Sequence, residues 1–158
     1  MAAFPTRWLG AWWPALAWAG VIFYGSTEAF SARRTSRFLG PVLRWLFPGL
    51  DEATVGTVQF LVRKGWHFTE YALLALLVDR ALRRQPAAPG SPLHRAAFTF
   101  LLAAGYACLD EFHQSFHPSR QGSPVDVLID SAGALAGLAA VHLQARGSAA
   151  SEFPPRPA

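Results

Sequence analysis

The feature that most constrains this chain is an uncharged stretch from Trp8 to Thr27. A helix needs about 20 predominantly apolar residues to cross the hydrocarbon core of a membrane, and this stretch has that length. Trp8, Trp12 and Trp13 lie near its start, where indole rings favour the interface between lipid and water. The stretch therefore predicts a membrane-spanning helix over residues 8–27.

The same stretch also fits a signal peptide. A short basic start and an apolar run precede the small residues Ala29, Ser31 and Ala32, which is the order found before a cleavage site. The apolar core of a signal peptide has about 7–15 residues, whereas this run is longer and rich in tryptophan. We therefore favour a retained helix over a cleaved one.

The composition agrees with a membrane protein of one domain. Hydrophobic residues make up 52% of the 158 residues and charged residues only 15%, whereas average proteins contain about 25% charged residues. A single cysteine excludes a disulfide framework. The net charge of +4 comes from short basic clusters between apolar runs. This pattern is typical of charges that flank membrane spans and argues against a nucleic-acid partner.

Three further spans are predicted where uncharged runs are extended by charged residues at one end. The uncharged runs alone are shorter than about 18 residues, so each span must include its charged end. The predicted helices cover residues 60–82, 96–116 and 125–145. Proline and glycine in the connections 83–94 and 117–124 predict turns between antiparallel neighbours.

The segments outside these spans have two different characters. Residues 38–50 mix Leu, Phe and Trp with one arginine, which predicts an interfacial segment lying on the membrane. Residues 147–158 are small, polar and proline-rich, so we expect a disordered tail. The predicted fold is therefore all-α: a polytopic four-transmembrane-helix bundle over residues 1–146, with an interfacial segment between the first two spans.

The basic residues suggest an orientation. Arg83, Arg84 and Arg95 lie in the connection between the second and third spans, whereas the next connection contains only Arg120. Lysine and arginine accumulate on the cytoplasmic side of short loops, so both termini are expected in the cytoplasm. The long first connection is also rich in arginine, which weakens this prediction.

Ionisable residues inside the predicted spans lie at similar depths, about 7–15 Å from one membrane face at about 1.5 Å of rise per residue. On each helix they share a face through their spacing of three or four residues. Each charge costs at least about 2.5–3.5 kcal/mol near the membrane centre, so they must face one another or a water-filled cavity. Apart from the histidines, these ionisable residues comprise five acids and two bases. Their excess of negative charge requires protonated acids, charged histidines, Arg63 or a bound cation.

Two stretches of the sequence together resemble the VanZ-like family. They are KGWHFTEYALLALL (64–77) and DEFHQSFHPSRQGSPVDVLIDSAGALAG (110–137). The match covers about residues 10–140, and it departs from the family at Ser131, where we expect the family often to have asparagine. The resemblance implies a small multi-pass protein of the bacterial cytoplasmic membrane, in a family named for a teicoplanin resistance protein.

The polar cluster and the resemblance point to the same residues. The candidate catalytic residues are His67, Glu70, Asp110, Glu111, His113 and Asp130. The candidate substrate-binding residues are Lys64, Tyr71, Gln114, Arg120 and Asp126. The expected site faces the extracytoplasmic side, and its expected partners are membrane lipids or a lipid-linked glycan, with an oligomer as an additional option.

Four functions remain open from the sequence. An enzyme acting on an envelope lipid would use His67 or His113 as general base, with Lys64 and Arg120 on an anionic head group. A metal-dependent version would use the candidate ligands His67, Glu70, Asp110 and His113. A non-enzymatic protein would bind a head group, an antibiotic or an ion. In a scaffold, the polar cluster would only join the helices.

Overall fold

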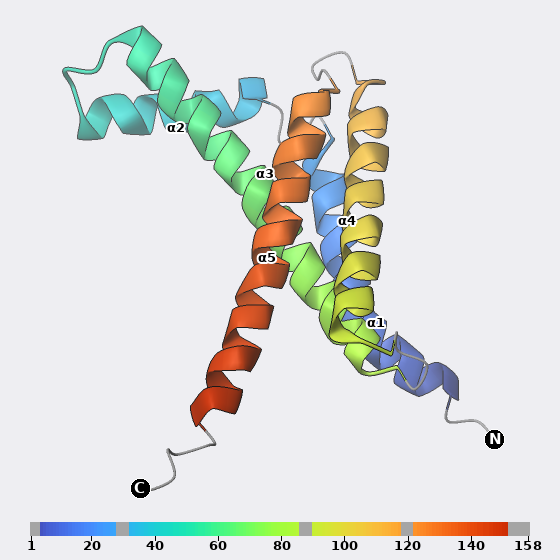
Figure 1. The fold of residues 1–158 in the computed structure, drawn as a ribbon. Coiled ribbons are helices and arrows are strands. Elements are labelled where there is room, and N and C mark those ends of the chain that lie inside the picture. Colours follow the sequence, from blue (N-terminus) through green and yellow to red (C-terminus); the bar gives the residue numbers. More distant parts are fainter. Residues whose placement is uncertain (1–3, 28–31, 86–89, 118–121, 152–158) are drawn as a thin grey trace, which may run out of the picture.

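The computed structural model describes residues 4–27, 32–85, 90–117 and 122–151, and this part of the chain contains helices and no strand (Figure 1). The helices are α1 (Phe4–Gly25), α2 (Ala32–Leu46), α3 (Glu52–Arg83), α4 (Pro92–Gln114) and α5 (Pro124–Ser151). The all-α prediction is confirmed, and each predicted span is a helix. Arg120 and residues 29–31 of the considered cleavage site lie outside the described residues.

The helix α3 begins at Glu52, well before the predicted start near Phe60. Asp51 is its N-cap, and the Asp51 side chain accepts a hydrogen bond of 2.7 Å from the backbone N–H of Thr54. Such a cap satisfies one of the backbone donors that a helix start leaves unpaired. The predicted boundary was wrong because it followed the length of a membrane span, whereas the capping residue decides where the helix starts.

The helix α2 occupies most of the segment predicted to be interfacial and begins earlier, at Ala32. It buries Gly40 and Leu43, while Phe38 and Trp45 are 78% and 80% exposed. Arg44 forms an ion pair with Glu52 at 2.7 Å, which joins α2 to the start of α3. In Figure 1, α2 runs across one end of the bundle beside the first turns of α3. The helix thus has one packed face and one apolar face without cover from the described residues.

The helices α3 and α5 cross at close range near the middle of the bundle (Figure 1). A Cβ atom added at Gly133 would collide with the backbone oxygen of Phe68, and one added at Gly137 would lie 2.5 Å from the backbone oxygen of Ala72. The expectation that this Gly-x-x-x-Gly pair allows close helix approach is therefore confirmed. The contact also sets Asp130, one turn before Gly133, against the turn of α3 that carries His67.

The bundle buries many polar groups and exposes much apolar surface. Leu101, Leu109, Leu128 and Leu143 are each at least 65% exposed. Soluble monomers rarely expose large contiguous apolar patches, so this distribution fits a lipid environment. By length and composition, one helix of the described chain qualifies as a membrane span, at Pro124–Gln144. The segment 8–27, the clearest candidate in the sequence, does not qualify, because its Trp, Tyr, Pro and Gly residues lower its mean hydropathy.

The helix α5 continues to Ser151, so the prediction of disorder is wrong for residues 147–151. Two alanines extend the helix there, and alanine has the highest intrinsic helix propensity. Residues 152–158 lie outside the described part of the chain.

Candidate functional site

Polar residues of α3, α4 and α5 contact one another near the end of α4 and the start of α5, which lie at the upper end of Figure 1. Contacts between the three helices bring their polar segments together, although on α3 this segment lies in the middle of the helix and not at its end. The candidate residues buried there are His67, Glu70, Tyr71, Asp110, Glu111, Gln114, Asp126 and Asp130. The end of α1 joins them through Ser26, which is also buried.

The innermost group consists of His67, Glu111 and Asp130, one from each of the three helices. Each offers a ligand atom within 4.8 Å of the others. His67 Nδ1 lies 3.4 Å from Asp130 Oδ1, without the alignment of a good hydrogen bond. Glu111 Oε2 accepts a 2.7 Å hydrogen bond from the backbone N–H of Ser123. This bond orients the carboxylate, so that its other oxygen remains available to the group.

Lys64 and Asp126 form an ion pair between the first predicted polar turn of α3 and the first turn of α5. Their side chains are 16% and 12% exposed, so water screens the pair only slightly. Lys64 is therefore neutralised by a carboxylate of the protein itself. The ammonium group of Lys64, which the sequence predicted to hold an anionic substrate, is therefore already paired in this structure.

Asp110 is held by α1 as well as by its own helix. Its Oδ2 accepts hydrogen bonds from Ser26 Oγ at 2.6 Å and from Gln114 Nε2 at 3.0 Å. Ser26 was absent from the predicted site residues, although it belongs to a Tyr-Gly-Ser stretch at the end of the first span. A hydroxyl at the end of the first span, beside the acid-bearing segments of the other helices, was the signal that could have identified it.

Two further predicted site residues, His113 and Tyr71, lie outside the inner group of three. The ring of His113 packs against Phe23 at 4.5 Å and against His117 at 4.8 Å between ring centroids. Tyr71 is fully buried near Tyr106, and its hydroxyl has no hydrogen-bond partner among the described residues. Of the four candidate metal ligands, His67 belongs to the inner group, whereas Glu70, Asp110 and His113 lie outside it.

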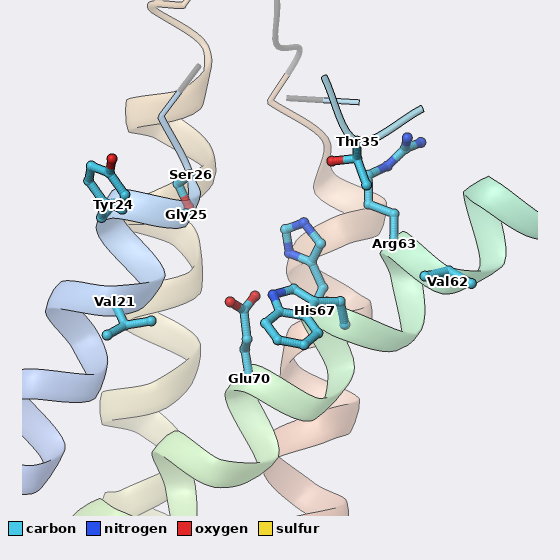
Figure 2. A pocket seen from close by; sticks show the side chains of 10 residues that line it. Val21, Tyr24, Gly25, Ser26, Thr35, Val62, Arg63, His67 and Glu70 are labelled. Atoms are coloured by element: carbon cyan, nitrogen blue, oxygen red, sulfur yellow. The ribbon is translucent and has the colours of Figure 1, made fainter. Parts of the chain in front are cut away.

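A cavity of about 400 Å³ lies between α1 and α3, below the first part of α2 (Figure 2). Its walls include the exposed apolar side chains Val21, Val62 and Trp66, so it opens to the outside of the bundle. Polar groups also line it: His67 and Glu70 from the buried cluster, and Arg63, whose guanidinium lies near Thr35 in Figure 2. The cavity thus joins an apolar outer wall to a polar interior.

Arg63 is the basic group that this cavity presents. Its guanidinium lies 5.7 Å from the ring centroid of Phe60, and no carboxylate of the described chain forms an ion pair with it. Of these two neighbouring basic residues, Lys64 is paired with a carboxylate, whereas Arg63 lines the cavity. The sequence indicated Arg63 only as a nearby source of compensating charge.

A family model for VanZ/LLP1 matches residues 11–144. The chain belongs to the VanZ/LLP1 family. Members of this family are membrane proteins, in agreement with the apolar surface of the bundle. The comparisons found no matching curated protein and no matching solved structure. The VanZ/LLP1 match extends from α1 into α5, so all the residues of the buried cluster and the cavity lie inside the family region.

Proposed function

We propose that this VanZ/LLP1 protein crosses the membrane four times and binds an anionic envelope lipid, or a lipid-linked glycan, in the cavity between α1 and α3. The observation that carries the proposal is the composition of the cavity: an open apolar wall leads to Arg63, His67 and Glu70. A hydrocarbon chain fits the wall, whereas a phosphate fits the polar part. Arginine favours such anions because its planar guanidinium can donate two parallel hydrogen bonds.

The same cavity supports chemistry on the bound head group. His67 and Glu70 both line it, and they are residue types that accept or donate protons in catalysis. Asp130 Oδ1 lies 3.4 Å from His67 Nδ1, and an opposite charge at this distance favours the protonated imidazole. Hydrolysis or transfer without a covalent enzyme intermediate is the reaction class that we propose, because these groups are acids and bases.

The proposed topology has both termini in the cytoplasm and the site near the extracytoplasmic face. It is supported by the arginines at the end of α3 and the start of α4, and by the arrangement of the bundle. In Figure 1, α1 begins and α5 ends at the end of the bundle opposite the site. The apolar, exposed side chains of α2 would then lie in the outer interface beside the cavity.

Binding is tested with purified protein and vesicles that contain either phosphatidylglycerol or phosphatidylcholine. Arg63→Gln is expected to weaken binding of the anionic lipid about tenfold or more, since a hydrogen bond to a charged group contributes about 1.5–3 kcal/mol. Arg84→Gln is the matched control, because Arg84 is an exposed arginine at the opposite end of the bundle. Equal binding by the wild type and Arg63→Gln would contradict the proposal.

Catalysis on the head group is tested separately. The lipid and glycan profiles of a deletion strain are compared with those of the same strain carrying the wild-type protein, His67→Gln or Glu70→Gln. We expect the wild type alone to restore the profile. An unchanged profile in the deletion strain, together with arginine-dependent lipid binding, would favour a binding protein without catalysis. Because the founding relative is connected with teicoplanin resistance, teicoplanin susceptibility of the same strains is a second readout.

A further inference from the structure

The group of His67, Glu111 and Asp130 contains four buried polar atoms that no described residue satisfies. They are Nδ1 of His67, Oε1 of Glu111 and both carboxylate oxygens of Asp130. The three residues are 8%, 4% and 0% exposed. A buried polar group without a hydrogen bond costs about 1–3 kcal/mol, and more when it is charged. His67 Nδ1 and Asp130 Oδ1 lie 3.4 Å from each other, whereas Glu111 Oε1 and Asp130 Oδ2 have neither a hydrogen bond nor an ion pair among the described residues. Such atoms gathered at one point indicate that something binds between them.

We propose that these three residues bind a first-row divalent transition metal. Their ligand atoms come from three helices and lie within 4.8 Å of one another. Around a metal with bonds of about 2.1 Å, ligand atoms are separated by about 3–4 Å, so the group has to contract by about 1 Å. The His67–Asp130 distance of 3.4 Å already fits.

The charge of the surrounding residues favours a cation. Lys64 is paired with Asp126, so it does not neutralise Glu111 or Asp130. No basic side chain of the described chain forms an ion pair with Glu111. A divalent ion would offset the two carboxylates of Glu111 and Asp130. One imidazole and two carboxylates suit Zn²⁺, Mn²⁺ or Fe²⁺, whereas Mg²⁺ and Ca²⁺ prefer oxygen ligands alone.

Two features of the protein prepare the group for a metal. The backbone N–H of Ser123 donates to Glu111 Oε2 and so directs Oε1 toward the group, as outer hydrogen bonds commonly do for metal ligands. His67 also lines the cavity, so the ion would lie next to the proposed head group. With His67 as a ligand, Glu70 remains as the proton-exchanging group that faces the cavity.

The test uses full-length protein purified in detergent, without a histidine tag and without chelator. Elemental analysis is expected to find stoichiometric Zn, Mn or Fe. Removal by chelator should lower the thermal unfolding temperature, and added Zn²⁺ or Mn²⁺ should restore it while Mg²⁺ does not. The readout does not require lipid, so it fails or succeeds independently of the proposed lipid function.

Two matched pairs of variants locate the metal. Glu111→Gln and Asp130→Asn are expected to lose it. Glu70→Gln and Asp110→Asn remove equally buried carboxylates outside the group and are expected to keep it. The proposal is overturned if the wild type holds no stoichiometric metal and shows no thermal shift with Zn²⁺, Mn²⁺ or Fe²⁺. It is also overturned if the two pairs lose metal equally.

Discussion

At the scale of single residues, contacts between neighbouring helices decide which charge pairs with which. Lys64 and Asp126 lie at the edge of the buried cluster, and each neutralises the other. Ser26 and Gln114 donate to Asp110, while Glu111 receives the backbone N–H of Ser123. The sequence identified nearly all these residues through their cost in a membrane, but it could not assign their partners, because partners are on other helices.

The ion pair of Lys64 and Asp126 provides a test at this scale. Lys64→Met leaves a mostly buried carboxylate without its partner, which we expect to lower the free energy of unfolding by about 3 kcal/mol. Adding Asp126→Leu should recover part of this loss, since replacing both charges removes the uncompensated one. Unfolding in mixed micelles measures both variants. Losses that simply add in the double variant would show that the two side chains do not interact.

At the scale of helices, the two glycines of α5 control the distance to α3. Gly133→Ala and Gly137→Ala place a methyl group against backbone oxygens of α3, which cannot rotate away as a side chain can. We expect each substitution to destabilise the bundle by about 1–3 kcal/mol. Gly105→Ala is the control in α4, because no atom lies within 4 Å of its added Cβ. It should be neutral or stabilising through helix propensity, and equal losses in all three would contradict the packing role.

The start of α3 predicts a dependence on pH. The hydrogen bond from the Thr54 backbone N–H holds the pKa of the Asp51 carboxyl below its usual range. Because the folded pKa is lowered, the cap stabilises the helix fully above the ordinary pKa of 3.8 and loses this effect as the pH falls through the folded value. Hydrogen exchange at the first turn of α3, corrected for its intrinsic pH dependence, measures this loss.

Two variants separate the cap from its charge. Asp51→Asn keeps a capping side chain without a titrating group, so the first turn of α3 should retain protection and lose its acid sensitivity. Asp51→Ala should expose the same amides at every pH. If Asp51→Asn kept the acid sensitivity of the wild type, another group would be responsible for it.

At the scale of the whole molecule, polarity is distributed in the reverse of a soluble bundle. Acids and histidine lie inside, whereas leucine and phenylalanine cover much of the outside. Composition and charge placement were sufficient to predict this arrangement, since a membrane tolerates intramembrane charges only where they face the bundle interior or water.

The four-span topology is tested by labelling with a membrane-impermeant maleimide in a Cys108→Ala background. Gly49→Cys lies at the site end of the bundle and Arg84→Cys at the opposite end, and both positions are exposed. Intact cells should label the cysteine at position 49, and position 84 should react only after the cells are opened. The reverse pattern would invert the proposed orientation, and labelling of both in intact cells would contradict a transmembrane bundle.

The sequence alone determined the helical class, the four long helices and the positions of the polar residues along them, because these depend on the order of apolar and charged residues along the chain. It did not determine the start of α3 or the helical end of α5, because capping and helix propensity act locally and independently of the span pattern. Only the tertiary structure decided that His67 meets Glu111 and Asp130 rather than His113. The rotation of each helix about its axis is set by packing, here by two glycines of α5 against α3, and packing is a property of pairs of helices.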